Sequence, residues 1–234
     1  MTEGDEGLGV QREQAELVSR LTHEIRGPVS TIRGLAGTTL AHYERLDDEE
    51  RREFLELIRR EADRLERTVE QVALALKLDA GTVRFDVRRQ DLGPIVRGAV
   101  QGTETGDHPL EVDADASVEA PVDGIQITVA VRQLIENAAA LSPPDSPISV
   151  RLFADGGDAV IEVGDRGPGI PPDRREAMFE RFADWRPTGY EDRPGTGLGL
   201  FICRAIVRAH GGEASIGDGP RGGTMLTIRL PVEG

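Results

Sequence analysis

Leu21-Thr22-His23-Glu24-Ile25-Arg26-Gly27-Pro28 is the stretch on which the organisation of this chain depends. The apolar residues around it recur at steps of three and four, which is the spacing of one helix face. They are Val18, Leu21, Ile25, Val29, Ile32 and Leu35. At about 100° per residue, their mean direction lies roughly opposite to His23. We therefore expect a helix over about residues 11–45 whose buried face leaves the imidazole exposed.

The neighbours of His23 distinguish it from an ordinary surface histidine. An acid, Glu24, follows it directly, and Gly27-Pro28 stands inside the helical pattern. Gly and Pro in a helix interior cost about 1 and 3 kcal/mol respectively, and Pro28 also removes a backbone donor. A sequence that places both beside an exposed, titratable imidazole indicates a functional site.

A second helix follows after a short acidic turn. Asp47 and Glu50 have the spacing of a capping box. An unbroken heptad seam comes next, and the helix is expected to end near Leu78. The seam residues are Leu55, Ile58, Ala62, Leu65, Val69, Val72 and Leu76.

Two long helices joined by a short turn predict an antiparallel hairpin. One hairpin leaves most of its apolar seam exposed, so we expect a homodimer in which two copies form a four-helix bundle. A plain dimerisation coiled coil is the alternative, but it does not explain Gly27-Pro28. We assign residues 1–81 to this first domain.

Residues 82–234 have the pattern of an α+β sandwich, with a sheet packed against helices. Alternating Val83, Phe85 and Val87 predict a strand. Further strands are expected at 110–112, 117–122, 148–154, 159–165, 214–216 and 224–230. Helices are expected at 91–100, 124–141 with Asp123 as its N-cap, and 200–210.

Composition narrows the class of protein. The formal net charge of -14 argues against a nucleic-acid-binding surface, which needs clustered basic residues. The single cysteine, Cys203, excludes a disulfide framework and favours a reducing compartment. No uncharged apolar run approaches the ~18 residues of a membrane span. We expect a cytoplasmic protein, or the cytoplasmic part of a longer one, without a direct membrane span.

Four stretches of the second domain carry polar chemistry. They are Gln133-Leu134-Ile135-Glu136-Asn137-Ala138, Asp165-Arg166-Gly167-Pro168-Gly169-Ile170, Met178-Phe179-Glu180-Arg181-Phe182 and Gly195-Thr196-Gly197-Leu198-Gly199-Leu200. The last is a Gly-rich turn at a helix start, which suits phosphate groups. Each stretch alone has an ordinary structural reading: a buried amide, a turn after a strand, or a glycine turn.

In this order and spacing, the four stretches resemble the ATP-binding domain of the sensor histidine kinases of two-component systems. The resemblance covers nearly the whole chain, because residues 23–28 are similar to the phosphoacceptor box of that family. Gyrase- and heat-shock-type ATPases share the Asn, Asp-x-Gly-x-Gly and Gly-rich elements, but not a histidine box on a helical hairpin. The resemblance implies ATP and Mg²⁺ as cofactors and the receiver domain of a response regulator as partner.

The resemblance also implies a role for each matched residue. His23 accepts the γ-phosphoryl group, and Glu24 orients or deprotonates its imidazole. Asn137 supplies an oxygen to Mg²⁺, and Asp165 accepts the hydrogen bond of the adenine amino group. Three further groups bind the nucleotide. Gly167 and Gly169 approach the base, Thr224 lies near the adenine through water, and Gly195, Gly197, Leu198 and Gly199 hold the phosphates beside a lid at 166–194.

Four positions depart from the family pattern. Gln133 replaces a second Asn, Ala140 replaces a basic residue, and Leu141 stands where an aromatic residue or His often contacts the base. Arg132, Arg181 and Arg186 are the candidates to replace the missing positive charge. Gly27 stands where the family commonly has Thr or Asn, a side chain thought to position the water that dephosphorylates the regulator.

Three functions remain open at this point. The first is an ATP-dependent histidine kinase that autophosphorylates on His23 and passes the phosphoryl group to an aspartate of a response regulator. The second is a dimeric phosphotransfer or scaffold protein with a degenerate ATP domain, which the changes at Gln133 and Ala140 favour. The third, an ATPase of the gyrase or chaperone type, leaves the His23 box unexplained. No input domain is evident before His23, so we expect the signal to enter through a separate sensor protein or through a part of the protein outside this sequence.

Overall fold

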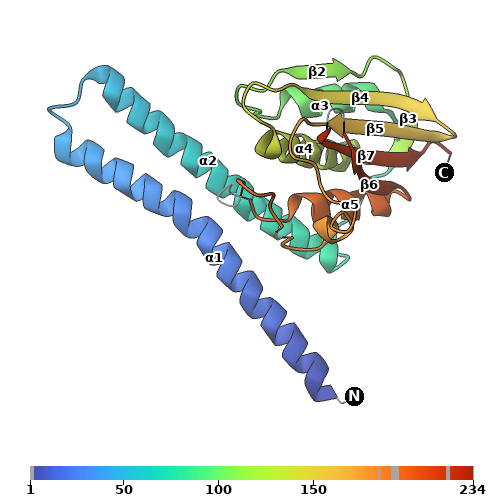
Figure 1. Ribbon diagram of the computed structural model, residues 1–234, viewed down its shortest axis with the longest axis horizontal. Coiled ribbons are helices and arrows are strands. Elements are labelled where there is room, and N and C mark those ends of the chain that lie inside the picture. The colour runs from blue at the N-terminus through green and yellow to red at the C-terminus, as the bar shows by residue number, and fades with distance from the viewer. Residues whose placement is uncertain (1–2, 184, 191–194, 220–221, 234) are drawn as a thin grey trace. The chain divides into compact units, whose positions relative to one another are not determined.

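The computed structural model describes residues 3–183, 185–190, 195–219 and 222–233, with the side chains of residues 3–20 and 23 left out (Figure 1). Contacts divide the chain into two units, and each is described by itself. The first contains Met1–Ala73 and Pro194–Thr196, and the second contains Leu74–Arg193 and Gly197–Gly234. The boundary between 1–81 and 82–234 remains a proposal.

The first unit is built on two helices, α1 (Glu3–His42) and α2 (Asp48–Asp79). Both were expected, but α1 begins earlier and ends earlier than the range 11–45. Extension of an existing helix costs little per residue, so Gly4, Gly7 and Gly9 do not stop it. α1 ends at His42 because the His42 carbonyl accepts hydrogen bonds from Arg45 and Leu46, which begins the turn. No helix in the described part of the chain is long and apolar enough to cross a membrane.

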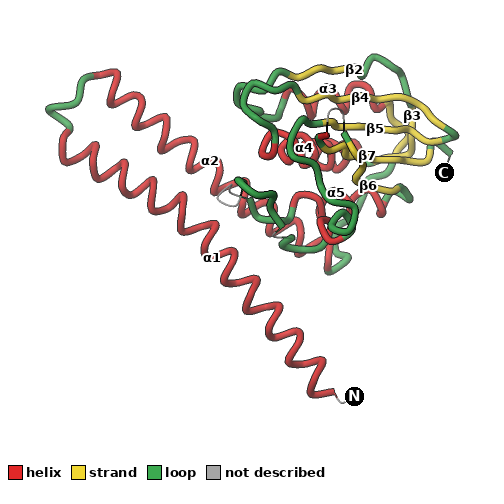
Figure 2. Tube along the Cα trace, in the orientation of Figure 1, coloured by secondary structure: helices red, strands yellow, loops and turns green. Residues whose placement is uncertain are grey.

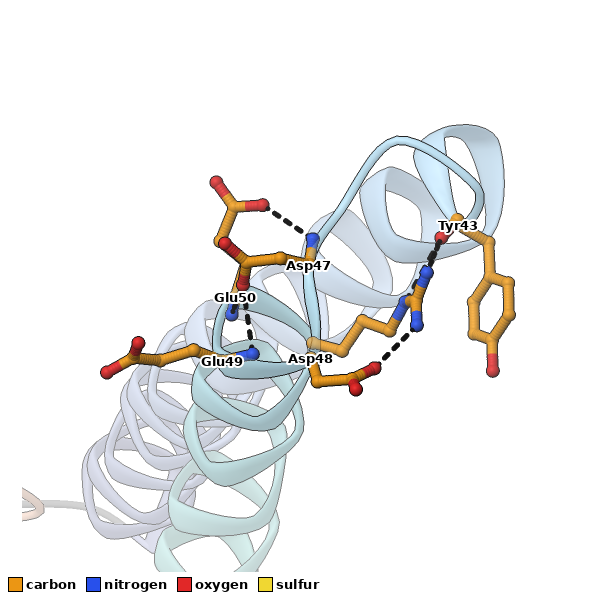
Figure 3. Close-up of polar contacts among 6 residues, drawn as sticks. Tyr43, Asp47, Asp48, Glu49 and Glu50 are labelled. Atoms are coloured by element: carbon orange, nitrogen blue, oxygen red, sulfur yellow. Dashed lines mark hydrogen bonds and ion pairs between the residues drawn. The ribbon is translucent and has the colours of Figure 1, made fainter.

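The turn between α1 and α2 contains the predicted capping box (Figure 3). Asp47 Oδ1 accepts hydrogen bonds from the backbone N–H groups of Glu49 and Glu50 at 2.9 and 2.8 Å. In return, Glu50 Oε2 accepts the Asp47 N–H at 3.0 Å. Arg51 donates to the Tyr43 carbonyl through Nε and Nη2 at 3.1 and 2.7 Å, which ties the start of α2 to the residue after α1.

The second unit contains two sheets. β1 (Arg88–Asp91) pairs with β3 (Glu119–Val122) in a two-stranded antiparallel sheet. The five-stranded sheet has the order β2-β4-β5-β7-β6. Its strands are β2 (Leu110–Asp113), β4 (Ile148–Asp155), β5 (Asp158–Gly164), β6 (Glu213–Asp218) and β7 (Thr224–Pro231). β2 runs parallel to β4, and the other pairs are antiparallel, so this sheet is mixed.

Three helices pack against this sheet, as Figure 2 shows. They are α3 (Leu92–Gln101), α4 (Gly124–Leu141) and α5 (Gly199–Ala209), and the short 3-10 helix η1 (Ala177–Phe179) contacts α5. Burial alternates along β7 from Thr224 to Pro231, which is the period expected when one face of a strand is covered. The expected α+β class is confirmed, and α4 has the predicted bounds and the predicted N-cap, Asp123.

One predicted strand is wrong. Residues 82–87 form no ladder, and the strand β1 begins at Arg88 instead. The segment is held by side chains from two helix ends. The Phe85 ring meets the His210 ring edge-on at 5.2 Å, and the Asp86 N–H donates to Asp123 Oδ2 at 3.0 Å. Phe85 therefore packs on a helix end and not in a strand pair, while Val87 is exposed.

Candidate functional site

One face of α4 spans the candidate site. Residues 133, 137 and 141 are four apart, so they share that face and extend over about 12 Å. At one end, Gln133 Oε1 lies 2.8 Å from the position that a Cβ on Gly199 would take. At the other end, the Leu141 carbonyl lies 2.6 Å from the corresponding Cβ position of Gly167. Asn137 therefore lies on α4 between the start of α5 and the turn after β5.

Asp165, the residue directly after β5, is fully buried at 0% exposure. Its Oδ1 accepts the backbone N–H groups of Gly167 and Thr224 at 2.7 and 3.0 Å. Its Oδ2 is buried and has no hydrogen-bond partner among the described residues. Burial raises the pKa of this carboxyl, and the hydrogen bonds from Thr224 and Gly167 oppose that rise. Burying an acceptor oxygen without a hydrogen bond costs free energy. The arrangement therefore suits a ligand that donates an N–H to Asp165 Oδ2.

Two glycines in the predicted motifs have backbones that other residues rarely adopt. Gly169 has φ +75°, and a Cβ on it would lie 2.8 Å from the Gly222 carbonyl. Gly197 has φ +67°, and a Cβ on it would collide with the Ala183 carbonyl. Glycine allows these conformations and close approaches at little steric cost. The motif glycines thus bring backbone segments together around the turn after β5 and before α5.

The start of α5 has the polarity that an anion needs. Leu198, the N-cap residue, is fully buried, and its apolar side chain makes no capping hydrogen bond. The first N–H groups of a helix have no partner within the helix, and with the helix dipole they favour phosphate groups. Gln133, whose amide nitrogen donates to Glu136 Oε2 at 3.1 Å, lies against this end through Gly199. The departure at position 133 therefore lies beside the predicted phosphate site.

Asn137 is the residue that could hold a divalent cation. It is half-buried, and its Nδ2 is a buried atom with no partner among the described residues. The described part of the chain contains no group of three or more His, Cys, Asp or Glu side chains that could form a metal centre by itself. Mg²⁺ keeps waters and substrate phosphates as ligands and needs only one or two protein oxygens. This donor set fits a cation that arrives with a nucleotide.

The phosphoacceptor stretch lies on α1. The backbone of His23 is helical, while its side chain lies outside the described residues. Glu24 Oε2 lies 3.6 Å from Arg64 Nη2 of α2, so the acid next to His23 is held against the second helix. Gly27 is exposed, and no heavy atom lies within 4 Å of the position of a Cβ there. Thr31 Oγ1 donates to the Gly27 carbonyl at 3.2 Å.

The predicted site residues fall into two groups. Within the second unit lie Asn137, Asp165, Gly167, Gly169, Gly197, Leu198, Gly199 and Thr224. His23, Glu24 and Gly195 belong to the first unit. Two of the arginines considered as a replacement for the missing basic residue have other partners. Arg181 Nη1 pairs with Asp79 Oδ2 at 2.7 Å, and Arg186 Nη1 donates to the Trp185 carbonyl at 3.0 Å.

Arg204 on α5 was not identified from the sequence. Its side chain is 10% exposed, and Nη1 pairs with Glu176 Oε1 at 2.6 Å. Nη2 donates to the Phe179 carbonyl at 3.0 Å, and the guanidinium lies 4.9 Å from the centre of the Phe179 ring. Arg204 thus anchors the segment at the base of the predicted lid to α5. The signal that could have found it is a charge inside the apolar run from Leu200 to Val207.

Comparison with known proteins supports both parts of the site. Residues 13–81 match the model of the His Kinase A (phospho-acceptor) domain. Residues 122–234 match the model of the histidine kinase-, DNA gyrase B- and HSP90-like ATPases. The signal transduction histidine-protein kinase/phosphatase MprB of Mycobacterium avium is 30% identical over 93% of this chain and 43% of its own length.

Two solved structures are similar as well. The mycobacterial sensor histidine kinase MprB has a TM-score of 0.54 and 32% identity, over 62% of this chain and 97% of that one. The Acinetobacter baumannii histidine kinase AdeS has a TM-score of 0.67 over 91% of this chain and 98% of that one, and at 19% identity it supports the fold alone. The chain spans between about a quarter and a half of the length of the curated relatives it matches. With a phosphoacceptor helix, the Asn137 and Asp165 motifs and these matches, the chain belongs to the histidine kinases of two-component systems.

Proposed function

We propose that this protein binds ATP in its second unit, autophosphorylates on His23 and passes the phosphoryl group to an aspartate on the receiver domain of a response regulator. The observation that carries this proposal is Oδ2 of Asp165, which is buried and has no partner among the described residues, near the end of α4 opposite the start of α5. An adenine amino group can supply the missing donor. We place the reaction in the cytoplasm, where ATP is available.

The remaining nucleotide contacts follow from the length of α4. With the base at Asp165, the phosphates extend toward Gly197, Leu198 and Gly199 at the N-terminus of α5, the helix end whose dipole favours phosphate groups. Asn137 lies between the two ends and would contribute an oxygen to Mg²⁺. When bound, Mg²⁺ neutralises charge on the phosphate oxygens. Thr224 completes the nucleotide-binding residues proposed in the second unit, and Gly195, which is proposed from its motif, is grouped with the first unit.

The chemical step needs few protein groups. A ring nitrogen of His23 donates its lone pair to the γ-phosphorus, the bond to the β–γ bridging oxygen breaks, and ADP leaves with that electron pair. Glu24 accepts the proton from, or orients, the other ring nitrogen, which keeps the attacking nitrogen unprotonated. Arg64 Nη2 lies 3.6 Å from Glu24 Oε2 and holds this carboxyl group against α2.

We also propose a homodimer built on the hairpin. Large apolar side chains of the first unit remain exposed in the single chain: Leu55 is 59%, Val69 53% and Val29 44% exposed. Burying each such side chain contributes about 1.5–3 kcal/mol. A second copy of the same hairpin would cover this seam as a four-helix bundle.

Gly27 bears on the balance between kinase activity and phosphatase activity toward the regulator. A phosphatase needs a polar side chain one helical turn after His23 to orient water, and position 27 has none. Thr31, the nearest alternative, already donates its hydroxyl proton to the Gly27 carbonyl. We propose strong kinase activity and little phosphatase activity toward the regulator, unlike the dual activity named for the M. avium relative.

The decisive experiment is incubation of the protein with γ-labelled ATP and Mg²⁺, with the His23→Gln variant as control. We expect a label in the wild type that is lost in acid, because phosphohistidine is acid-labile, and none in the variant. An acid-stable label, a label on the variant, or no label despite ATP binding would each contradict the proposal. The last result would favour the scaffold alternative.

A further inference from the structure

Ser142, the residue that ends α4, carries a buried hydroxyl that the fold does not use. Its side chain is 0% exposed, and its Oγ has no hydrogen-bond partner among the described residues. The backbone N–H of Ser142 closes the helix by donating to the Ala138 carbonyl, so the hydroxyl takes no part in the cap. Burying a hydroxyl without a hydrogen bond is unfavourable, and a binding role can explain why this position has one.

The next serine in the same loop shows the ordinary behaviour. Ser146 Oγ donates to the Pro143 carbonyl at 2.7 Å, a local bond that stabilises the turn. Carbonyl groups are therefore within reach of serine hydroxyls in this loop. The lack of a partner at Ser142 is particular to that position.

The position of Ser142 is next to the base end of the candidate site. The carbonyl of the preceding residue, Leu141, lies 2.6 Å from the Cβ position of Gly167. The Gly167 N–H in turn donates to Asp165 Oδ1 at 2.7 Å. Two buried polar atoms without partners among the described residues, Ser142 Oγ and Asp165 Oδ2, thus belong to the two segments that approach each other at Leu141 and Gly167.

The two atoms differ in what they can offer a ligand. An ionised carboxylate only accepts hydrogen bonds, whereas a hydroxyl can donate one. The edge of adenine presents an amino donor beside a ring-nitrogen acceptor, N1. Guanine presents the opposite pattern there, with an acceptor oxygen beside an N1–H donor.

We propose that Ser142 is a base-recognition residue, whose hydroxyl donates to the adenine N1, directly or through one water, while Asp165 Oδ2 accepts from the amino group. This inference rests on the proposed function, since it assumes that ATP binds at Asp165. It adds a second polar contact, supplied by α4, to the one supplied by the turn after β5. Together the two contacts select adenine by its paired donor and acceptor.

The test compares the wild type with Ser142→Ala, using calorimetry with ATP and with 1-deaza-ATP, which lacks the N1 acceptor. Loss of one hydrogen bond should weaken ATP binding about 3- to 10-fold. The variant and the wild type should bind 1-deaza-ATP equally, because that ligand cannot use the hydroxyl. Ser146→Ala is the matched control and should leave both affinities unchanged.

Thermal unfolding without nucleotide distinguishes a role of Ser142 in recognising the base from a role in stabilising the fold. Ser142→Ala should unfold at the same or a higher temperature than the wild type, because an unpaired buried hydroxyl is removed. Ser142→Cys, which keeps the size but is a weak donor, provides the binding measurement if the alanine variant does not fold. Equal ATP affinity in wild type and variant, an equal loss with both ligands, or a lower unfolding temperature would overturn the inference. Failure of the wild type to bind ATP would instead refute the proposed function.

Discussion

Asp165 and Thr224 are joined by two hydrogen bonds that leave one carboxylate oxygen unused. The Asp165 N–H donates to the Thr224 carbonyl at 2.9 Å, and the Thr224 N–H donates to Asp165 Oδ1 at 3.0 Å. This pair fixes the carboxylate at the edge of β7, with Oδ2 buried and unpartnered among the described residues. The side chain is therefore oriented before any ligand arrives, which lowers the entropic cost of binding.

Asp165→Asn should weaken ATP binding by at least about tenfold, which corresponds to the loss of roughly 1.4 kcal/mol. The asparagine carbonyl can keep both backbone hydrogen bonds, so its NH₂ group takes the place of Oδ2 and opposes the adenine amino group, donor against donor. Calorimetry with ATP measures the effect. Purine riboside triphosphate, which lacks the amino group, is the control ligand and should lose much less affinity. Unchanged ATP affinity would refute the role assigned to Asp165.

The same variant should change the dependence of stability on pH. Burial raises the pKa of Asp165, so between the ordinary value of about 3.9 and the raised value the folded state binds more protons than the unfolded state. The free energy of unfolding of the nucleotide-free wild type therefore falls as the pH rises through this window. The Asp165→Asn variant has no carboxyl group at this position, so its free energy of unfolding does not fall in this window. The difference between variant and wild type should therefore increase from pH 4 toward neutrality and then stay constant. Denaturant titrations at several pH values measure the free energy of unfolding of both proteins. A difference between them that does not change with pH would contradict the destabilising effect of the buried Asp165 carboxylate.

Glu24→Gln should slow phosphorylation of His23 by about 10²-fold or more, the usual scale of acid–base catalysis, while ATP affinity stays unchanged. Glu61→Gln is a matched control, because Glu61 Oε2 lies 3.7 Å from Nη1 of Arg64, the arginine that also pairs with Glu24. It removes a carboxylate from the same arginine without changing the neighbour of His23. Single-turnover labelling gives the rates, and equal slowing by both variants would assign the effect to Arg64 instead.

Gly27→Thr should create or raise phosphatase activity toward the phosphorylated regulator. No heavy atom lies within 4 Å of the Cβ position at Gly27, so the new side chain fits without displacing a neighbour. Gly34→Thr is the control, since that position on the same helix is equally open but lies about three turns from His23. Phosphate release from the regulator in the presence of ADP is the measurement. Release by the wild type well above the regulator's own decay would contradict the bias proposed for Gly27.

Val69→Asp should separate the proposed homodimer into folded monomers. Val69 is 53% exposed in the single chain, so the change costs the monomer little, whereas an unpaired charge in a covered seam is strongly unfavourable. Arg67→Asp introduces the same residue at an exposed position outside the seam and should leave the dimer intact. Light scattering at micromolar concentration distinguishes the two states. A monomeric wild type would exclude the dimer at that concentration.

Much of the fold could be predicted because its signals are local. The capping box of Asp47 and Glu50 and the N-cap at Asp123 depend on residues two or three positions apart, so the starts of α2 and α4 were predicted correctly. The segment 82–87 could not be assigned this way. Whether an extended segment pairs depends on partners far along the chain, and here Phe85 meets His210 instead of another strand.

The candidate site shows the same division. Asp165, Asn137 and the motif glycines were identified because they lie in short motifs with fixed spacing. Ser142 and Arg204 were not, because Ser142 Oγ lacks a partner among the described residues and Arg204 has partners 24 to 28 positions away. Such properties belong to the packed chain and cannot be derived from local spacing.

The sequence by itself determined the helical hairpin, the α+β second domain and the motif residues, since periodicity, capping and turn chemistry act over a few residues. Only the tertiary structure decided that α4 connects the start of α5 to the turn after β5, with Gln133 against Gly199 and Leu141 against Gly167. It also decided which polar atoms remain without partners among the described residues. The physical reason is that a hydrogen bond is satisfied or lost according to which distant segments folding brings into contact.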